Sequence, residues 1–274
     1  MENLKILFLG EIVGKSGVFV IKNLLSRFKN EHNIDFVIAN GEGATRGFGL
    51  GKNHSIYLHK LGVNCITSGE CIYYKLDMVP HIGHADYILR PVNYPERNPG
   101  RGWGIYEAKG IKIGVVNILG QSGFSRVHLK NPFTLMPRIV SQMKEKANIV
   151  IVDFHAATTG EKQGFFFHMD GQVTAIIGTH SKVLTADERL LPQGTAIITD
   201  AGRCGSINSV GGLDTEIEIR KFLTGIPEYS KAAWENLEMQ GVVMEITPEG
   251  KALSIERFRI ACEEIPDERT RNNQ

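Results

Sequence analysis

Cysteine is scarce and scattered in this sequence, and neither sign of charge dominates. The four cysteines, Cys65, Cys71, Cys204 and Cys262, lie far apart and form no CxxC pair, which argues against a zinc ribbon or a thioredoxin-like site. Reduced thiols in a cytoplasmic protein are the default for such usage. Because 31 basic residues balance 30 acidic ones, no global field draws the chain to nucleic acid or membrane. No basic run carries interleaved aromatics, so we expect no dedicated nucleic-acid-binding surface.

Long apolar runs and linker-like segments are also missing. The apolar segment Ile6–Leu9 is too short for a signal peptide or a membrane span and is typical of a strand. We therefore expect a cytoplasmic protein with no membrane partner. No low-complexity stretch or internal repeat divides the chain, which predicts a single domain over residues 1–265. The polar residues 266–274 predict a disordered tail.

The first third of the chain repeats one pattern, in which a short apolar strand leads into a glycine-containing loop and then a helix. Strands are predicted at Lys5–Leu9, Phe36–Ala39 and Cys65–Thr67, and helices at Val18–Phe28 and Ser55–Leu61. This alternation predicts βαβ units and a largely parallel α/β sheet, with functional residues at the carboxyl ends of the strands.

The rest of the chain mixes hairpins with further strands. Hairpins are predicted around Lys109-Gly110 and around the turn at residues 248–250, and a helix is predicted near Phe133–Lys146. Single strands are predicted to end near His155, His180 and Asp200.

Five of these strand ends carry side chains that bind metals, namely Glu11, Glu42, Glu70, His155 and His180. Each alone is more often a solvated charge or a structural hydrogen-bonding group. Together, three carboxylates and two imidazoles suit a borderline divalent ion such as Zn, Mn or Fe. The sequence therefore predicts a metal or catalytic cleft at the carboxyl ends of these strands.

Lys182 follows His180 by two residues. In an extended segment two such side chains point the same way, so both are expected to reach one spot. A protonated lysine has no lone pair and cannot bind a metal.

The order and spacing of these strand ends resemble a known family. The motifs that carry the resemblance are Gly10–Gly14, Asn40–Ala44, Gly69–Cys71, Asp153–Ala156 and Gly178–Lys182, with Arg90–Pro95, Thr185–Asp187 and Ile198–Asp200 in addition. Over about residues 4–261 the chain resembles the bacterial YmdB-type metallophosphoesterases of the calcineurin-like superfamily. The resemblance implies an α/β fold with two mixed β-sheets in a sandwich flanked by helices. It also implies a two-metal site and hydrolysis of phosphodiesters, with 2′,3′-cyclic nucleotides as the associated substrates.

Five positions depart from the family's pattern. The pattern has aspartate in place of Glu11, asparagine in place of Gly43 and Glu70, and histidine in place of Cys71 and Lys182. The first metal of the pattern uses positions 11, 42, 43 and 182, and the second uses 42, 70, 155 and 180. The second set keeps four metal-binding groups here. We therefore expect one divalent ion, with a second one doubtful and the Lys182 ammonium in its place, holding a non-bridging phosphate oxygen.

The departures also change the charge of the site. With two divalent ions the family's pattern is positive, whereas three glutamates, one divalent ion and Lys182 sum to zero here. A neutral site attracts phosphate less and lacks half of a two-metal clamp. A second hypothesis is therefore a catalytically inactive descendant that serves as a binding, regulatory or assembly module, and a third is a changed substrate.

The remaining candidates carry weaker signals. Cys71 replaces a histidine that protonates the leaving oxygen, but a thiol near carboxylates is a poor acid, so an inert buried thiol, a metal-bound thiolate and a nucleophile all stay open. Asn93 and Asn117 either orient ligands or cap turns, and Arg90 either contacts phosphate or forms a buried ion pair. Relatives form oligomers, which implies a homo-oligomer.

Overall fold

Two β-sheets stacked face to face form the centre of this computed structural model, which describes residues 2–124 and 129–264. The first sheet has the strand order β2-β11-β12-β1-β3-β4, with β13 paired to β12, and the second has the order β5-β6-β7-β8-β10-β9. The first sheet contains β1 (Leu4–Leu9), β2 (Glu11–Ile12), β3 (Phe36–Asn40), β4 (Cys65–Thr67), β11 (Arg203–Ser206), β12 (Leu237–Ile246) and β13 (Ala252–Ala261). The second contains β5 (Trp103–Ala108), β6 (Ile111–Leu119), β7 (Ile149–His155), β8 (Ala175–Thr179), β9 (Arg189–Leu190) and β10 (Ala196–Ile198).

Both sheets are mixed. In the first, β1, β3 and β4 run parallel, while β12 is antiparallel to β1, β11 and β13. In the second, β6, β7, β8 and β10 run parallel between the antiparallel edge strands β5 and β9. The expected sandwich of two mixed sheets is therefore confirmed.

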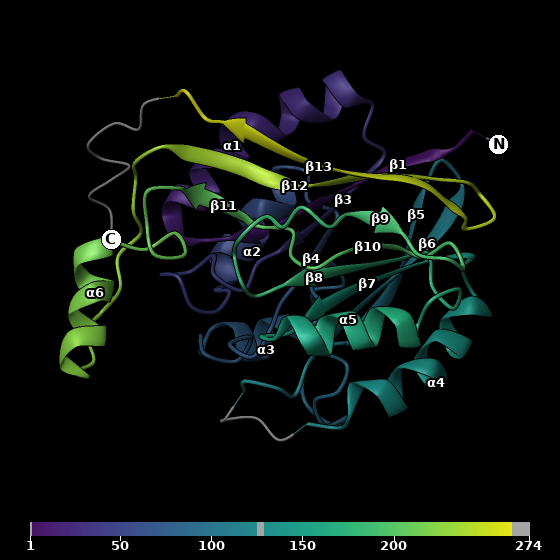
Figure 1. Cartoon of the computed structure of the whole chain (residues 1–274), viewed down its shortest axis with the longest axis horizontal. Helices are drawn as coiled ribbons and strands as arrows, with labels where there is room; N and C mark the ends of the chain where they lie inside the picture. Colours follow the sequence, from purple (N-terminus) through teal and green to yellow (C-terminus); the bar gives the residue numbers. More distant parts are fainter. Residues whose placement is uncertain (1, 125–128, 265–274) are drawn as a thin grey trace.

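Helices cover the outer faces of the sandwich (Figure 1). Their bounds are α1 (Gly14–His32), α2 (Lys52–Lys60), α3 (Met78–Ile82), α4 (Pro132–Lys144), α5 (Thr159–His168) and α6 (Thr215–Thr224). In Figure 1, α1 lies beyond the first sheet, α4 and α5 lie beyond the second, and α6 projects from one end.

Three apolar layers follow from this arrangement. Side chains such as Ile6 and Phe8 of β1 and Ile151 of β7 fill the space between the sheets. The outward side chains of the first sheet pack under α1 and α2, and those of the second pack under α4 and α5. Alternate residues of one strand therefore serve two different apolar layers, as the pleat of a strand requires.

Helix α6 is an element that the sequence reasoning missed, although its end signals are present. The Asp214 side chain accepts a hydrogen bond from the Ile217 N–H at 3.0 Å, and Gly225 ends the helix with a φ of 66°. The apolar side chains Phe222 and Leu223 are more than four-fifths exposed, so the helix shows no buried apolar stripe of the usual kind. Strand β11 was also missed, because its sequence Arg-Cys-Gly-Ser carries no apolar run.

The strand ends deliver the candidate ligands from opposite sides. Glu11, Glu42 and Glu70 come from β2 or directly after β3 and β4, all in the first sheet, whereas His155 and His180 come from the ends of β7 and β8 in the second. The predicted tail at 266–274 lies outside the described residues. Among the described helices, none has the length and apolar character needed to cross a membrane.

Candidate metal centre

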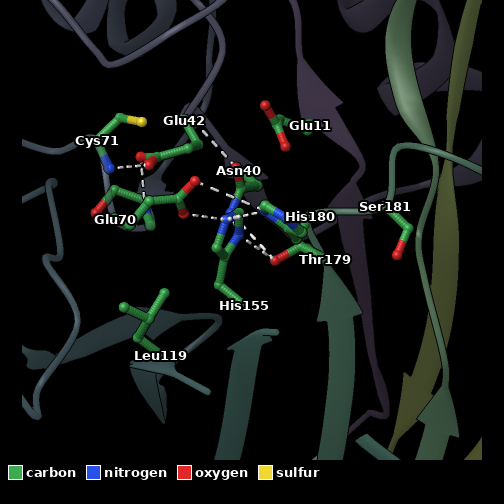
Figure 2. Close-up of polar contacts among 12 residues, drawn as sticks. Glu11, Asn40, Glu42, Glu70, Cys71, Leu119, His155, Thr179, His180 and Ser181 are labelled. Atoms are coloured by element: carbon green, nitrogen blue, oxygen red, sulfur yellow. Dashed lines mark hydrogen bonds and ion pairs between the residues drawn. The ribbon is translucent and has the colours of Figure 1, made fainter. Parts of the chain in front are cut away.

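Glu70, His155 and His180 converge at the seam between the two sheets (Figure 2). His155 Nε2 lies 3.0 Å from Glu70 Oε2 and 3.1 Å from His180 Nδ1. One ligand atom from each of the three residues lies within 4.8 Å of the other two. The structure thus brings together three of the predicted ligands from distant parts of the chain.

The electrostatics of this trio follow from the short contact between His155 and Glu70. Burial disfavours both charged forms, but the hydrogen bond between the two groups and their opposite charges outweigh it. The pKa of His155 is raised to about 9, and the pKa of Glu70 is lowered to about 2. For His180, burial and then the neighbouring His155 charge lower the pKa to about 4. A protonated His155 beside a neutral His180 therefore neutralises Glu70 when no ion is bound.

Glu42 reaches the same place from the loop after β3. Its carboxylate accepts hydrogen bonds from the backbone N–H of Gly69, at 2.6 Å, and of Cys71. Burial first, and the charge of Glu70 second, raise the pKa of Glu42 to about 8. Glu42, Glu70 and Cys71 form a second group of donor atoms within 4.8 Å, so Glu70 is shared between the two groups.

A buried polar network that the sequence reasoning missed orients His155. The Thr179 hydroxyl donates to Asp153 Oδ1 at 2.6 Å and lies 2.9 Å from His155 Nδ1. Because that hydroxyl donates its proton to Asp153, its lone pair accepts a hydrogen bond from the Nδ1–H of His155. Asp153 also accepts from Asn40 Nδ2 at 2.9 Å and from the Thr67 hydroxyl. The network leaves Nε2 of His155 aimed at the convergence point, which is how metal-binding histidines are usually fixed.

A signal for this network was present in the sequence. Asn40, Thr67, Asp153 and Thr179 are polar residues on otherwise apolar strands, and all four are fully buried. Buried polar groups require partners, so polar residues in line with predicted ligands mark the groups that orient them.

The backbone after β8 differs from the expected extended segment. His180 has a φ of 98° and Lys182 a φ of 60°, both unusual for residues with a Cβ. Two groups hold this turn, since the Ser181 N–H donates to Asp200 at 2.8 Å and the Lys182 carbonyl accepts from Arg203 at 2.6 Å. The predicted extended geometry of residues 180–182 is therefore wrong, because the chain turns here.

Lys182 instead forms an ion pair with Glu11. Its Nζ lies 3.2 Å from Glu11 Oε1, and the two side chains are 17% and 2% exposed. Burial disfavours the ammonium, but the Glu11 charge outweighs burial and raises the pKa of Lys182 above its usual range. Glu11 stands apart from the trio in Figure 2. The Lys182 ammonium therefore lies on the Glu11 side of the site.

Two glycines leave room for these carboxylates and rings. A Cβ on Gly43 would lie 2.7 Å from Glu11 Oε1, and a Cβ on Gly69 would clash with His155 Nε2 and lie 2.9 Å from Glu42 Oε1. Real Cβ atoms do not make such contacts with fixed neighbours. Both positions therefore require glycine while Glu11 and His155 keep their places.

Cys71 is buried, and its backbone N–H binds Glu42. Burial, and then the charges of Glu42 and Glu70, raise the pKa of its thiol far above the usual range. The side chain is therefore a neutral thiol at neutral pH, and its catalytic role stays a prediction.

The polar atoms of the three predicted substrate-binding residues form hydrogen bonds with other parts of the protein, mostly its backbone. Asn93 binds the backbone of Leu119 with both its oxygen and its nitrogen, at 3.1 and 2.7 Å. The Arg90 guanidinium donates to backbone carbonyls, including that of Pro91 at 2.9 Å. Asn117 accepts from Ser68 at 3.3 Å. A role for them in substrate binding stays a prediction.

Comparison with known proteins agrees with this geometry. A family model described as "YmdB-like protein" matches residues 7–258. The 2′,3′-cyclic-nucleotide 2′-phosphodiesterase of Bacillus subtilis is 34% identical over 258 residues, which cover 94% of this chain and 97% of that protein. The crystal structure of a novel phosphatase from Mycoplasma pneumoniae superposes with a TM-score of 0.88 at 37% identity, over 95% of each chain.

A more distant neighbour shares the fold alone. The NAD nucleotidase of Haemophilus influenzae has a TM-score of 0.62 at 11% identity, over 94% of this chain and 56% of that one. The expected calcineurin-like phosphoesterase fold is confirmed by these neighbours. With a family match across nearly the whole length and a well-covered relative above 30% identity, the chain belongs to the YmdB-like family.

Proposed function

We propose that this protein is a metal-dependent phosphodiesterase whose site holds one divalent transition ion through Glu42, Glu70, His155 and His180. The convergence of Glu70, His155 and His180 within 4.8 Å carries the proposal. The name of the Bacillus subtilis relative supports 2′,3′-cyclic nucleotides as substrates.

The residues present fit a borderline divalent ion. Two imidazole nitrogens and two carboxylates are donors that Fe, Mn and Zn accept. The Thr179 hydroxyl holds the Nδ1–H of His155, so that Nε2 points at Glu70 and His180. An ion at this point would replace the proton that His155 otherwise shares with Glu70.

A bound ion supplies Lewis-acid chemistry, by polarising a phosphoryl oxygen and lowering the pKa of water. The chain's own residues do the rest. Lys182 offers a fixed positive charge that binds a non-bridging phosphate oxygen, and Glu11 holds its ammonium in place at 3.2 Å. Hydrolysis joins a water oxygen to phosphorus, breaks the bond to the leaving oxygen, and passes a water proton to that oxygen.

The lack of room for a side chain at Gly43 supports one ion rather than two. An asparagine at position 43, as in the family's pattern, would place its Cβ 2.7 Å from Glu11 Oε1. The longer Glu11 side chain and the missing side chain at Gly43 therefore fit each other, and Lys182 binds the carboxylate that results. The three departures act as one change that removes the first metal position.

Metal analysis and activity test the proposal together. The protein purified from cells grown with added Mn and Fe should hold about one equivalent of transition metal and hydrolyse bis-p-nitrophenyl phosphate and 2′,3′-cyclic AMP. His155→Ala should lose both the metal and at least about 10²-fold in kcat/KM. His84→Ala, which changes an exposed histidine, is the matched control and should keep both.

Other outcomes contradict the proposal in distinct ways. Two equivalents of metal would overturn the single-ion site. No metal, together with no turnover in added Mn, would favour the non-catalytic binding or assembly module. Self-association, a cytoplasmic location and a single domain over residues 1–265 stay predictions.

A further inference from the structure

A cavity of about 690 Å³ opens next to the candidate metal centre, and nothing in the proposed chemistry uses it. Its walls come from the start of α1, the loop between β3 and α2, the segment around Lys75, and residues 221–234. The volume is in the range of pockets that hold small organic ligands. Its lining indicates which ligand chemistry it accepts.

The lining is strongly cationic. Five of its side chains are lysine or arginine and one, Glu228, is acidic. Glu228 is already neutralised by Arg220, whose nitrogens lie 2.8 and 3.0 Å from its oxygens. Lys221 is neutralised by Glu218 at 2.7 Å. The other four cations, Lys15, Arg46, Lys75 and Lys231, form no ion pair within residues 2–124 and 129–264. An anion is the ligand that these charges favour.

The start of α1 adds to the same field. The helix begins at Gly14 on the cavity wall, has no side-chain cap at Val13, and carries no acidic residue in its first turn. The Gly14 N–H donates to the Gly43 carbonyl at 2.9 Å, and the helix dipole favours negative charge at this end. The start of the helix therefore adds to the positive potential of the four lysine and arginine side chains.

Three aromatic residues, Phe48, Tyr229 and Trp234, line the cavity together with the cations. Phe48 is 42% exposed, and the partly buried Trp234 is held edge-on by Phe19, with ring centroids 5.9 Å apart. Aromatic faces beside phosphate-binding cations are the usual platform for nucleic-acid bases. A simple inorganic anion would leave the rings unused.

The cavity and the metal centre share a wall. Lys182 Nζ lies 5.8 Å from the centre of the Phe48 ring, and the same ring lines the cavity. The loop that carries Thr45, Arg46 and Phe48 begins directly after Glu42. An oligonucleotide with one phosphate at Lys182 would therefore have Phe48 within reach of its next nucleotide.

We propose that this cavity binds the neighbouring nucleotide of a linear oligonucleotide, with its base on Phe48 or Trp234 and its phosphate against Arg46, Lys75 and Lys15. The reacting phosphodiester then lies at the metal centre, so this assignment of substrate class rests on the proposed function. A ligand with a second phosphate should be preferred over one that has only the reacting phosphate.

Binding is measured first, without turnover. In a Trp103→Phe background Trp234 is the remaining tryptophan of the chain, and its fluorescence reports ligand in the cavity. The probe is tri-adenylate with phosphorothioate linkages, which keep the charge and resist hydrolysis. Arg46→Gln/Lys75→Gln should weaken binding about tenfold or more at low salt, because ionic contacts to the strand are lost. Arg97→Gln/Lys251→Gln removes the same charges from exposed positions outside the lining and should bind normally. Equal affinity in the two double variants would overturn the proposal.

Turnover then separates the two proposals. The wild type should hydrolyse ApApA with a higher kcat/KM than ApA, and Arg46→Gln/Lys75→Gln should abolish that preference while keeping the rate on bis-p-nitrophenyl phosphate. An unchanged preference would overturn the cavity assignment. If no diester is hydrolysed while tri-adenylate binding still depends on Arg46 and Lys75, the cavity remains a nucleotide site and the proposed function fails.

Discussion

The ammonium of Lys182 lies 3.2 Å from Glu11 Oε1, and the pair joins the loop after β8 of one sheet to β2 of the other. Glu11 is 2% exposed, and neither of its oxygens makes a hydrogen bond that meets the usual geometry among the described residues. The buried carboxylate therefore depends on Lys182 for its compensation.

Removing one partner of this pair should cost stability. Lys182→Met leaves Glu11 buried and uncompensated, and we expect the free energy of unfolding to fall by about 2 kcal/mol in urea titrations. Glu11→Gln/Lys182→Met should recover most of that loss, because no charge is left without a partner. A double variant that is no more stable than Lys182→Met would contradict this account.

The lack of room at Gly43 beside Glu11 predicts the outcome of a second set of single and combined variants. Gly43→Asn alone forces a Cβ against Glu11 Oε1 and should destabilise the protein by about 1–3 kcal/mol. Glu11→Asp shortens the carboxylate and should relieve much of that cost in the double variant. Adding Lys182→His should then raise the metal content toward two equivalents. The count is measured by elemental analysis, and one equivalent in the triple variant would show that other features block the second ion.

The pKa values predict how the metal-free protein responds to pH. His155 and Glu42 have pKa values raised to about 9 and about 8, so the folded state holds protons that the unfolded chain releases near 6.5 and 4.5. For raised values the stabilisation is present at low pH and is lost as pH rises toward the folded value. Between about pH 6.5 and pH 8 both groups act in this direction, and from about pH 8 to pH 9 His155 does so alone.

We therefore expect the melting temperature in EDTA to fall as pH rises through this interval. Thermal unfolding followed by circular dichroism measures it, and His155→Gln should flatten the response. Added Mn²⁺ should also flatten it, because an ion replaces the shared protons. A melting temperature that rises from pH 6.5 to pH 9 in EDTA would contradict the charge assignment of this site.

Thr179 is expected to act on the metal through His155. Thr179→Val removes the hydroxyl that accepts the Nδ1–H of His155, and metal affinity should fall about 10–100-fold. Thr195→Val, at a second fully buried threonine with hydrogen bonds of its own, is the matched control and should leave metal affinity unchanged. Competition with a chelating dye measures both. Equal losses in the two variants would point to general destabilisation instead.

Burial should protect the cysteine at the site from alkylation. Cys65, Cys71 and Cys204 are buried, whereas Cys262 is partly exposed with its pKa raised to about 12. Mass spectrometry after iodoacetamide treatment of the folded protein at pH 8 should find slow labelling at Cys262 and none at the other three. Rapid labelling of Cys71 would indicate an accessible thiolate and revive its role as a nucleophile.

The sequence was sufficient for the features that local patterns encode. Apolar runs located β1, β3, β4 and β7, and the polar residues at or after their ends located Glu42, Glu70 and His155. The carboxyl ends of parallel strands meet at one edge, which is why reading strand ends found the ligands.

What the sequence did not predict depends on the turns and on contacts between distant segments. The left-handed backbone at His180 and Lys182 is held by Asp200 and Arg203, which lie about twenty residues further along the chain. The basic cavity is built from segments that include Lys15, Arg46, Lys75 and residues 221–234, so no basic run appears in the sequence. Helix α6 was missed although Asp214 and Gly225 mark its two ends in the sequence.

The origin of the ligands has a consequence for the order in which the protein assembles. Its carboxylates come from the first sheet and its imidazoles from the second, so neither sheet alone holds a complete set. An ion bound here would cross-link the two sheets. It would therefore be captured late in folding, and its affinity would measure how firmly the two halves are closed on each other.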